Sequence, residues 1–304
     1  MPNRFQHFDT RQKMKGDSYE IFYYQDRHLG PVALHHHDFY EVYFFLSGNV
    51  QYNIESRSYL LTPGDILLIS PMELHQPVFH SDQRDYERIV LWINQRYLAD
   101  LCSPGQDLSA CFDTTASGHT NLLRPGNAMR QLLTYQLEQL MIESESGDTY
   151  SGLSSLTYLV QVLICLNRLA ALSAQRGESR AESDSAVYSV LTYINEHYNE
   201  DLSLDYLANR FFISKYHLSR EFNRLVGTSV HRYLIQKRLA MAKQMMSGGM
   251  ASTEVYQHCG FGDYSNFYRA FKAEYQITPK EFAARLKAPS ELPLGRLLRE
   301  PAEK

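Results

Sequence analysis

The sequence predicts a multidomain α+β protein in which a small β-barrel precedes an all-α domain. Three observations carry this prediction. Up to about residue 94, aromatic and β-branched residues come in short runs broken by Gly, Pro and Ser, as in β-strands. From Met129 onward the apolar residues recur every three or four positions, as in helices. Between Leu202 and Phe282 a short helix, a turn and a longer helix are encoded twice, about fifty residues apart.

The composition is that of a globular protein with room for about two domains. Of 304 residues, 44% are hydrophobic and 21% are charged, which argues against wholesale disorder. No uninterrupted run of roughly 18 apolar residues occurs, so no membrane-spanning helix is expected, and residues 1–6 do not resemble a signal peptide. The cysteines lack CxxC spacing and are expected to be reduced packing residues in the cytoplasm.

The charge is unevenly distributed along the chain. Residues 201–286 contain twelve Lys and Arg against seven Asp and Glu, a net charge of +5 within a chain whose total is −4. The remainder therefore carries −9. This asymmetry favours a basic nucleic-acid-binding module joined to an acidic sensing module.

The first part of the chain reads as a series of short strands. Residues 39–46 form an aromatic run that ends at Ser47, Gly48 and Asn49, and residues 50–55 are expected to pair back on it as a hairpin. Residues 66–69 and 88–93 predict two further buried strands. Many short strands with regular turns indicate an all-β sandwich or a small barrel.

A histidine-rich motif in this region resembles the two motifs of the cupin barrel. The resemblance rests on residues 35–41, Gly48, residues 63–65 and residues 71–75. In metal-binding cupins the corresponding positions hold a divalent ion, and here they would be His35, His37, Glu41 and His75. Imidazole and carboxylate groups suit Zn, Fe, Mn or Ni, and His35 and His37 are expected on one face of a strand.

Two other interpretations of these residues stay open. The polar side chains can instead line the barrel and hydrogen-bond one another or a small molecule, with no metal or other cofactor. Trp92, the only tryptophan, is either a stacking platform for a flat-faced ligand or a core residue. The candidate ligand-binding residues are therefore His35, His37, Glu41, His75 and Trp92.

Two helical stripes follow the barrel. One contains Met129, Leu132, Leu133, Leu137, Leu140 and Met141, and the other contains Leu153, Leu156, Leu159, Val160, Leu163, Leu166 and Leu169. The near-heptad spacing of the second favours a dimer contact, although both helices can simply cover the barrel. The expected domains are a barrel at 1–118, a helical segment at 119–176, a linker at 177–185, a DNA-binding domain at 186–286 and a tail at 287–304.

Both halves of the repeated stretch have helix-turn-helix layout. Ser203 and Ser214 are suited to cap the first two helices, Gly227 to end the second, and Asp263 to cap the last. Residues 229–246 are expected to join the halves as one long helix. The outer faces would then carry Lys215, Tyr216, Ser219, Arg220 and Asn223 in the first half, and Tyr264, Ser265, Tyr268, Arg269 and Lys272 in the second.

This stretch resembles the DNA-binding domain of the AraC/XylS family of bacterial regulators. The resemblance rests on Gly260-Phe261, residues 263–267, Arg269, Phe271-Lys272 and Thr278-Pro279, and on Ser214, His217-Leu218, Arg220, Phe222, Gly227, Tyr233 and Arg238. It implies base-facing positions at Tyr216, Ser219, Arg220, Ser265, Tyr268 and Arg269. Arg220 and Arg269 can each contact guanine O6 and N7 or only phosphates, and Lys215 and Lys272 are expected at phosphates. Three residues depart from the family pattern: Tyr256 replaces a small alanine, Gln276 a helix-ending glycine, and Val230 a proline.

The resulting expectation is a cytoplasmic, ligand-responsive, sequence-specific DNA-binding transcription regulator that is not an enzyme. Its barrel would sense a small molecule, by resemblance a sugar. The expected partners are double-stranded DNA at an operator or promoter, the effector, a second copy of the chain and RNA polymerase, and no membrane. The alternative is a metal-dependent cupin enzyme, an isomerase or oxygenase, which leaves the duplicated helix-turn-helix unexplained.

Overall fold

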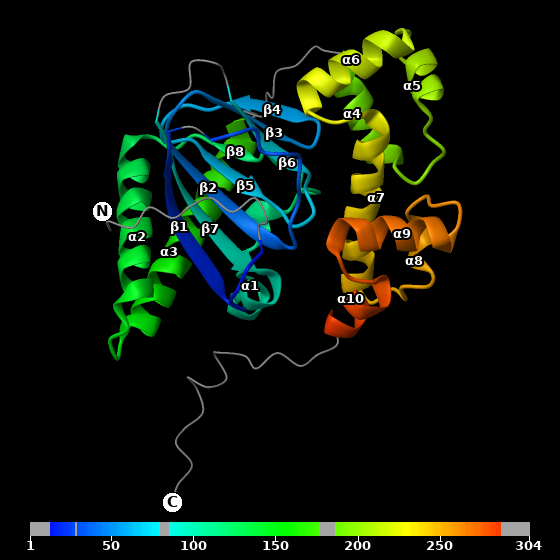
Figure 1. Ribbon diagram of the computed structural model, residues 1–304. Helices are drawn as coiled ribbons and strands as arrows, with labels where there is room; N and C mark the ends of the chain where they lie inside the picture. The colour runs from blue at the N-terminus through cyan, green and yellow to red at the C-terminus, as the bar shows by residue number, and fades with distance from the viewer. Residues whose placement is uncertain (1–12, 28, 80–84, 177–185, 287–304) are drawn as a thin grey trace, which may run out of the picture. The chain divides into compact units, whose positions relative to one another are not determined.

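The computed structural model describes residues 13–27, 29–79, 85–176 and 186–286, and the chain divides into two compact units, residues 1–182 and 183–304 (Figure 1). The expected linker at 177–185 and tail at 287–304 lie outside the described residues, as does the extreme N-terminus.

The first unit contains two antiparallel sheets. Their strands are β1 (Tyr19–Asp26), β2 (Phe39–Ser47), β3 (Val50–Ile54), β4 (Arg57–Leu60), β5 (Ile66–Ile69), β6 (His75–Phe79), β7 (Tyr86–Asn94) and β8 (Leu122–Leu123). The larger sheet has the order β1-β7-β2-β5-β8, and the smaller has the order β4-β3-β6. The expected barrel, residues 1–118, leaves out β8, which pairs with β5.

Alternate residues of the large sheet face two different cores. Along β2, Val42 and Phe44 belong to a cluster shared with the helices, whereas Tyr43 and Phe45 belong to a cluster shared with the small sheet. The same alternation separates Leu91 from Trp92 in β7. The unit is therefore a three-layer structure of small sheet, large sheet and helices (Figure 1).

The expected hairpin between residues 39–46 and 50–55 is wrong. β3 pairs with β4 and β6 in the small sheet and not with β2. Gly48 lies at the crossing point with φ +130°, a conformation that favours glycine, and a Cβ there would lie 3.3 Å from the Tyr86 ring. The chain thus passes from one sheet to the other where the hairpin turn was expected.

The helical layer consists of α1 (Gln95–Leu101), a 3₁₀ turn (Ala110–Phe112), α2 (Asn127–Ser146) and α3 (Ser151–Arg176). Most of the two expected stripes is used inside the unit, since Leu133, Leu137, Leu159 and Leu163 pack into the cluster that covers the large sheet. Leu132 and Leu153 do not, and both are exposed.

The segment Ser151–Gln175 in α3 is long and apolar enough, by length and composition alone, to cross a membrane. This differs from the expectation that no such helix exists, because scattered polar residues such as Asn167 interrupt the apolar run without removing its average hydrophobicity. Asn167 itself bonds to the backbone of Cys111 and Leu108. The buried side of α3 packs on the large sheet and on α2, as a core helix does.

The second unit is entirely helical in its described part. Its helices are α4 (Ala186–His197), α5 (Leu204–Arg210), α6 (Lys215–Val226), α7 (Val230–Ser247), α8 (Val255–His258), α9 (Tyr264–Tyr275) and α10 (Pro279–Leu286). Ser203, Ser214, Ser229 and Asp263 each accept a backbone N–H at a helix N-terminus. Gly227 ends α6 in the left-handed conformation. These caps, except that of Ser229, were all expected from the sequence.

Helix α7 holds the two halves of this unit together. Arg238 donates to the carbonyl oxygens of Tyr198 and Glu200 at 2.7 and 2.6 Å, which fixes the connection between α4 and α5. On the same helix, Arg232 pairs with Glu274 of α9 at 2.6 Å. The two helix-turn-helix halves are thereby coupled through one helix.

The departures in the second half are accommodated locally. Gln276 takes the left-handed conformation that a glycine would favour, with φ 59°, and ends α9. Tyr256 packs edge-on against Tyr264 at 5.9 Å between ring centroids. The helix that carries it, α8, has only 4 residues, whereas the corresponding α5 has 7.

Gly260 packs so closely against backbone that it leaves no room for a side chain. Its φ is +77°, and a Cβ would lie 2.7 Å from the backbone oxygen of Asn199.

We expect Gly260→Ala to lower the free energy of unfolding by about 2 kcal/mol or more. The matched control is Gly249→Ala, which has φ +97° but open space around it and should cost only about 1 kcal/mol. Equal losses in urea unfolding of the two variants would contradict the close approach.

Candidate functional site

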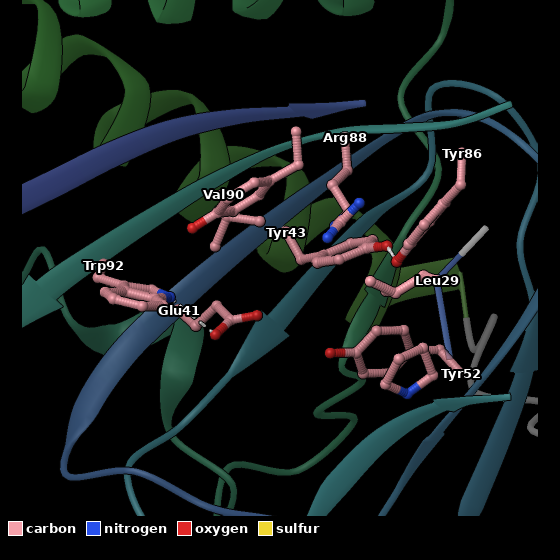
Figure 2. A pocket seen from close by; sticks show the side chains of 10 residues that line it. Leu29, Glu41, Tyr43, Tyr52, Tyr86, Arg88, Val90 and Trp92 are labelled. Carbon is pink, nitrogen blue, oxygen red and sulfur yellow. Dashed lines mark hydrogen bonds between the residues drawn. The ribbon is translucent and has the colours of Figure 1, made fainter. Parts of the chain in front are cut away.

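A pocket lies between the two sheets of the first unit, and its wall is made of strand residues that face inward (Figure 2). Strands β1, β2, β3, β6 and β7 all contribute, and Leu29 comes from the loop after β1. The lining residues are Tyr24, Leu29, Glu41, Tyr43, Tyr52, Pro77, Tyr86, Arg88, Val90 and Trp92. Four tyrosines, a carboxylate, a guanidinium and an indole make this a polar, aromatic pocket.

Arg88 places a positive charge at one end of the pocket. Its side chain is only 2% exposed, pairs with Asp26 at 2.6 Å, and lies over the rings of Tyr24 and Tyr86. Burial raises the pKa of both tyrosines, with Arg88 opposing the shift, so both stay protonated as hydrogen-bond donors. Tyr86 shares a hydrogen bond with Tyr43 through their hydroxyl groups.

Glu41 places a carboxylate on the opposite side of the pocket. It lies directly across the ladder from Trp92, and the indole N–H donates to its Oε2 at 3.0 Å. The same oxygen lies 3.0 Å from Nε2 of His37. Because the Nδ1 of His37 faces the carbonyl oxygen of Phe39 at 2.9 Å, that nitrogen carries hydrogen. The His37–Glu41 contact is a hydrogen bond between two buried side chains.

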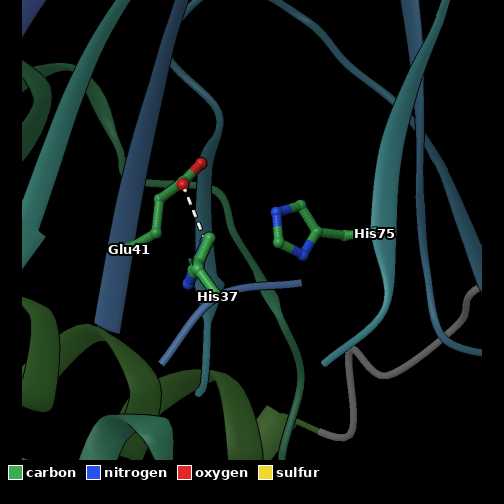
Figure 3. A group of neighbouring side chains, drawn as sticks. All are labelled: His37, Glu41 and His75. Atoms are coloured by element: carbon green, nitrogen blue, oxygen red, sulfur yellow. Dashed lines mark hydrogen bonds and ion pairs between the residues drawn. The ribbon is translucent and has the colours of Figure 1, made fainter. Parts of the chain in front are cut away.

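Glu41, His37 and His75 form a compact group in which one possible ligand atom from each residue lies within 4.8 Å of the other two (Figure 3). His35 lies beside it, with its ring centroid 4.3 Å from that of His75. His35 and His37 had been expected on one face of a strand, but neither lies within one. Both belong to the segment before β2, and His35 reaches the group through a single bridge to His75.

One ring nitrogen of His75, and one of the neighbouring His35, has no hydrogen-bond partner among the described residues. Nδ1 of His35 donates to the carbonyl of Ala33 at 2.9 Å, and Nδ1 of His75 donates to that of Glu73 at 2.8 Å. Among the described residues, Nε2 of each is shielded from solvent and has no hydrogen-bond partner. Burial lowers the pKa of both rings, well below the usual range for His75. Both Nε2 atoms therefore carry a free lone pair.

This arrangement suits either of two ligands. A metal ion would find imidazoles whose second nitrogen is held by a backbone carbonyl, the usual outer support of a metal-binding histidine. The residues available to hold it are His37, Glu41 and His75, with His35 beside them. A ligand hydroxyl could instead donate its hydrogen to a free Nε2. In either case an acceptor that is buried and unpaired gains a partner.

Trp92 is a core residue that also lines the pocket. Its ring packs edge-on against Phe22, with 4.6 Å between ring centroids, and its centroid lies 4.8 Å from that of Phe39, as in a core residue. It also lines the pocket and orients Glu41.

The candidate DNA-contacting residues of the first half lie together on α6. Lys215, Tyr216, Ser219 and Arg220 are all exposed, while Leu218 and Phe222 on the opposite face are buried. Lys215 pairs with Asp205 of α5. Arg220 lies near Glu221 at 3.3 Å and over the Tyr216 ring at 5.8 Å, exposed and able to exchange these contacts.

The corresponding residues of the second half lie on α9, but two are less open than expected. Ser265, Arg269 and Lys272 are exposed, whereas Tyr264 and Tyr268 are half-buried. Tyr264 packs against Phe267 in the core of this half. Arg269 donates to Asn266 Oδ1 at 2.6 Å, which holds its guanidinium on the outer face.

Two features of the structure were not predicted from the sequence. Arg88 lies four residues before Trp92 on β7, so the period of two places both side chains on the same, pocket-facing side of the strand. Phe212, in the turn before α6, is the other, with φ +54° and 95% exposure. The signal was an aromatic residue where a helix ends and glycine is usual.

Comparisons with known proteins match both units. Residues 19–160 match the family model of the AraC-like ligand binding domain, and residues 207–285 match that of the helix-turn-helix domain. The chain is 25% identical over 248 residues to the HTH-type transcriptional activator RhaS of Escherichia coli O157:H7 (strain EC4115 / EHEC), covering 81% of this chain and 86% of that protein.

Two solved structures are also similar. The C-terminal domain of the two-component response regulator yesN from Fusobacterium nucleatum is 31% identical and covers 31% of this chain and 94% of its own, with a TM-score of 0.30. Fatty-acid-bound ToxT from Vibrio cholerae is 14% identical and covers 92% of this chain and 100% of its own, with a TM-score of 0.37. At these TM-scores the likeness carries no functional inference.

The ion pair between buried Arg88 and partly buried Asp26 is the electrostatic anchor of the pocket. We expect Asp26→Asn to lower the free energy of unfolding by about 3 kcal/mol, because it leaves a buried guanidinium without its counter-charge. Asp85→Asn is the control, since the Arg27–Asp85 pair is exposed and 3.5 Å long and should contribute at most about 0.5 kcal/mol. Denaturant unfolding of the first unit measures both, and similar losses would argue against the anchor.

Proposed function

The chain belongs to the AraC/XylS family of transcription regulators, and on that premise we propose how its two units divide the work. The second unit binds operator or promoter DNA through α6 and α9. The first binds a small-molecule effector between its two sheets. The protein acts in the cytoplasm, where its DNA is, and not as an enzyme. The observation that carries this is the pairing of an AraC-like ligand binding domain with a helix-turn-helix domain in one chain.

DNA contact is assigned to two capped helices with matched outer faces. Each reading helix begins at a side-chain cap, Ser214 for α6 and Asp263 for α9, so its N-terminal turn is fixed and can approach base edges. Arg220 and Arg269 occupy equivalent exposed positions, and an arginine there can contact guanine O6 and N7. Lys215 and Lys272 are placed at phosphates. RNA polymerase is a further expected partner once the protein is bound at a promoter.

The chemistry of the pocket favours an effector rich in hydroxyl groups, such as a sugar. Within the pocket, the carboxylate of Glu41 accepts hydrogen bonds and buried tyrosine hydroxyls donate them. The free lone pairs of His35 and His75, in the histidine group that adjoins Glu41, are further acceptors. Trp92 and Tyr52 offer flat faces for the C–H side of a ring. The side chains nearly fill the space, so the effector must displace some of them. Leu29 is the lining residue outside any strand or helix.

A divalent metal ion is the second candidate for the same group. The unpaired Nε2 atoms, each backed by a backbone carbonyl, favour it. An ion would act there as a Lewis acid on a bound oxygen. An ion bound by His37 and Glu41 would replace the hydrogen bond between them. The engagement of Glu41 with Trp92 and His37 makes the hydroxyl-bearing effector our first choice.

We assign dimerisation to the outer face of α2 and α3. The large apolar side chains exposed on or between these helices are Leu132, Tyr135, Ile142, Tyr150, Leu153 and Leu172. An apolar face of this kind is typical of a contact with a second copy. Two copies would also present two DNA-binding units to repeated half-sites.

Light scattering on the full chain measures the oligomeric state directly, and a monomer at high concentration would refute dimerisation.

DNA reading by α9 predicts a specific loss on removing its arginine. Arg269→Ala should weaken binding by roughly 1–3 kcal/mol on a duplex selected from a random pool by the wild-type protein. On random-sequence duplex it should change binding little. Lys272→Ala should instead weaken both and reduce the salt slope by about one. Arg285→Ala, an exposed change on α10, is the control. An unchanged ratio of selected to random affinity in Arg269→Ala contradicts base reading.

The two ligand hypotheses predict different thermal shifts for the full-length protein. With a hydroxyl-bearing effector, one member of a panel of sugars and polyols raises the melting temperature, and chelator has no effect. His75→Gln should abolish that shift, whereas His119→Gln, an unpaired histidine outside the group, should not. Near-stoichiometric Zn, Fe, Mn or Ni in protein purified without chelator, lost in His75→Gln, would assign the group to a metal.

A further inference from the structure

The turn between α5 and α6 contains a residue in an unfavourable conformation. Phe212 has φ +54°, in the left-handed region that a bulky L-residue rarely adopts. The backbone there closes the end of α5, with Phe211 N–H donating to Leu207 and Ile213 N–H donating to Ala208, at 3.1 and 3.0 Å. This pattern requires a left-handed residue at position 212, and glycine or asparagine normally supplies it.

The chain itself shows the ordinary solution in its second half. At the end of α8, Cys259 N–H donates to Val255 and Phe261 N–H donates to Tyr256, each at 3.1 Å, which repeats the pattern around Phe212. The left-handed residue between them is Gly260, with φ +77°. Two equivalent turns therefore carry glycine in one case and phenylalanine in the other.

Phe212 is also exposed to a degree that folding does not explain. Its 95% exposure is the highest among the large apolar residues of the described chain, and the next, Tyr150, has 76%. A side chain that both strains the backbone and meets water contributes nothing evident to the stability of its unit. Strain of this kind is concentrated at functional sites.

The position of Phe212 indicates what it contacts. It lies two residues before Ser214, the cap of α6, and therefore next to the first turn of the helix proposed to read DNA. That turn carries Lys215 and Tyr216, the latter 75% exposed. In helix-turn-helix proteins the N-terminal residues of the second helix approach the base edges.

We propose that Phe212 is a DNA-contacting residue, which packs its ring against deoxyribose or a thymine methyl group beside the bases read by α6. This rests on the proposed function, since it requires that α6 enter the major groove. Thymine methyl groups are the apolar feature of that groove, and phenylalanine is a suitable partner for them. Burial of the ring in the complex would compensate for its exposure in the free protein.

The proposal predicts opposite changes in stability and in affinity. Phe212→Gly and Phe212→Asn should raise the melting temperature by a few degrees, because both residues accept the left-handed conformation. The same variants should bind a duplex selected from a random pool by wild-type protein about five- to tenfold more weakly. Phe212→Tyr, which keeps the ring, should stay within about twofold.

Salt dependence separates this contact from an electrostatic one. An apolar ring displaces no counter-ions from DNA when the protein binds. Phe212→Gly should therefore leave the slope of affinity against salt unchanged. Lys215→Ala, at the first residue of α6 and directly after its cap Ser214, should lower that slope by about one. Full-length protein and fluorescence anisotropy at several salt concentrations provide both measurements.

Several outcomes would overturn the proposal. One is a stabilised Phe212→Gly that binds the selected duplex as tightly as wild type. Another is unchanged DNA binding with an altered dimer constant or effector response, which would assign Phe212 to a protein contact. If the wild-type protein enriches no duplex from the pool, the proposed DNA-binding function fails as a whole. Failure of Phe212 alone leaves that function intact.

Discussion

The large sheet of the first unit is buried on both faces, and the chemistry of the sensor depends on this. Helices α2 and α3 cover one face with an apolar cluster, which leaves the opposite face as the place where polar strand residues can gather. Glu41 and Arg88 lie on that inner face, among aromatic rings and away from water. A buried charge must find partners inside the protein, and here the partners are Asp26, Trp92 and His37. The pocket is thus polar because of its residues, and its charged groups are paired within the protein.

The second unit is constrained in a different way. Its two halves have small cores of their own, with Leu218 and Phe222 in one and Phe267 and Phe271 in the other. Neither is large, and α7 joins them through Arg238, Arg232 and its own buried face. The spacing between the two reading helices is therefore set inside this unit. A signal from the effector would therefore act by repositioning the whole second unit, and not by changing the spacing between its two reading helices.

Much of this could be predicted from local sequence signals, for reasons that are themselves local. The caps at Ser203, Ser214 and Asp263 were correct because a cap depends on one side chain and the backbone three residues away. The family resemblance was correct because it rested on many residues at fixed spacing. What failed depended on partners distant in the chain. β3 joined the small sheet instead of pairing with β2, and His35 reached the histidine group from a loop. The strain at Phe212 is visible only in backbone angles.

The contact between Gly260 and Asn199 bears on how such proteins can be recombined. The turn of the second half lies against the backbone that connects α4 to α5 in the first, so the two halves share a surface that belongs to neither alone. A chimaera that exchanges one half for that of a relative would divide this surface. A workable cut would need to transfer the α4–α5 connection with the second half, or to take both halves together. The pair of halves, and not the single helix-turn-helix, is then the unit that evolution or an engineer can move between sensors.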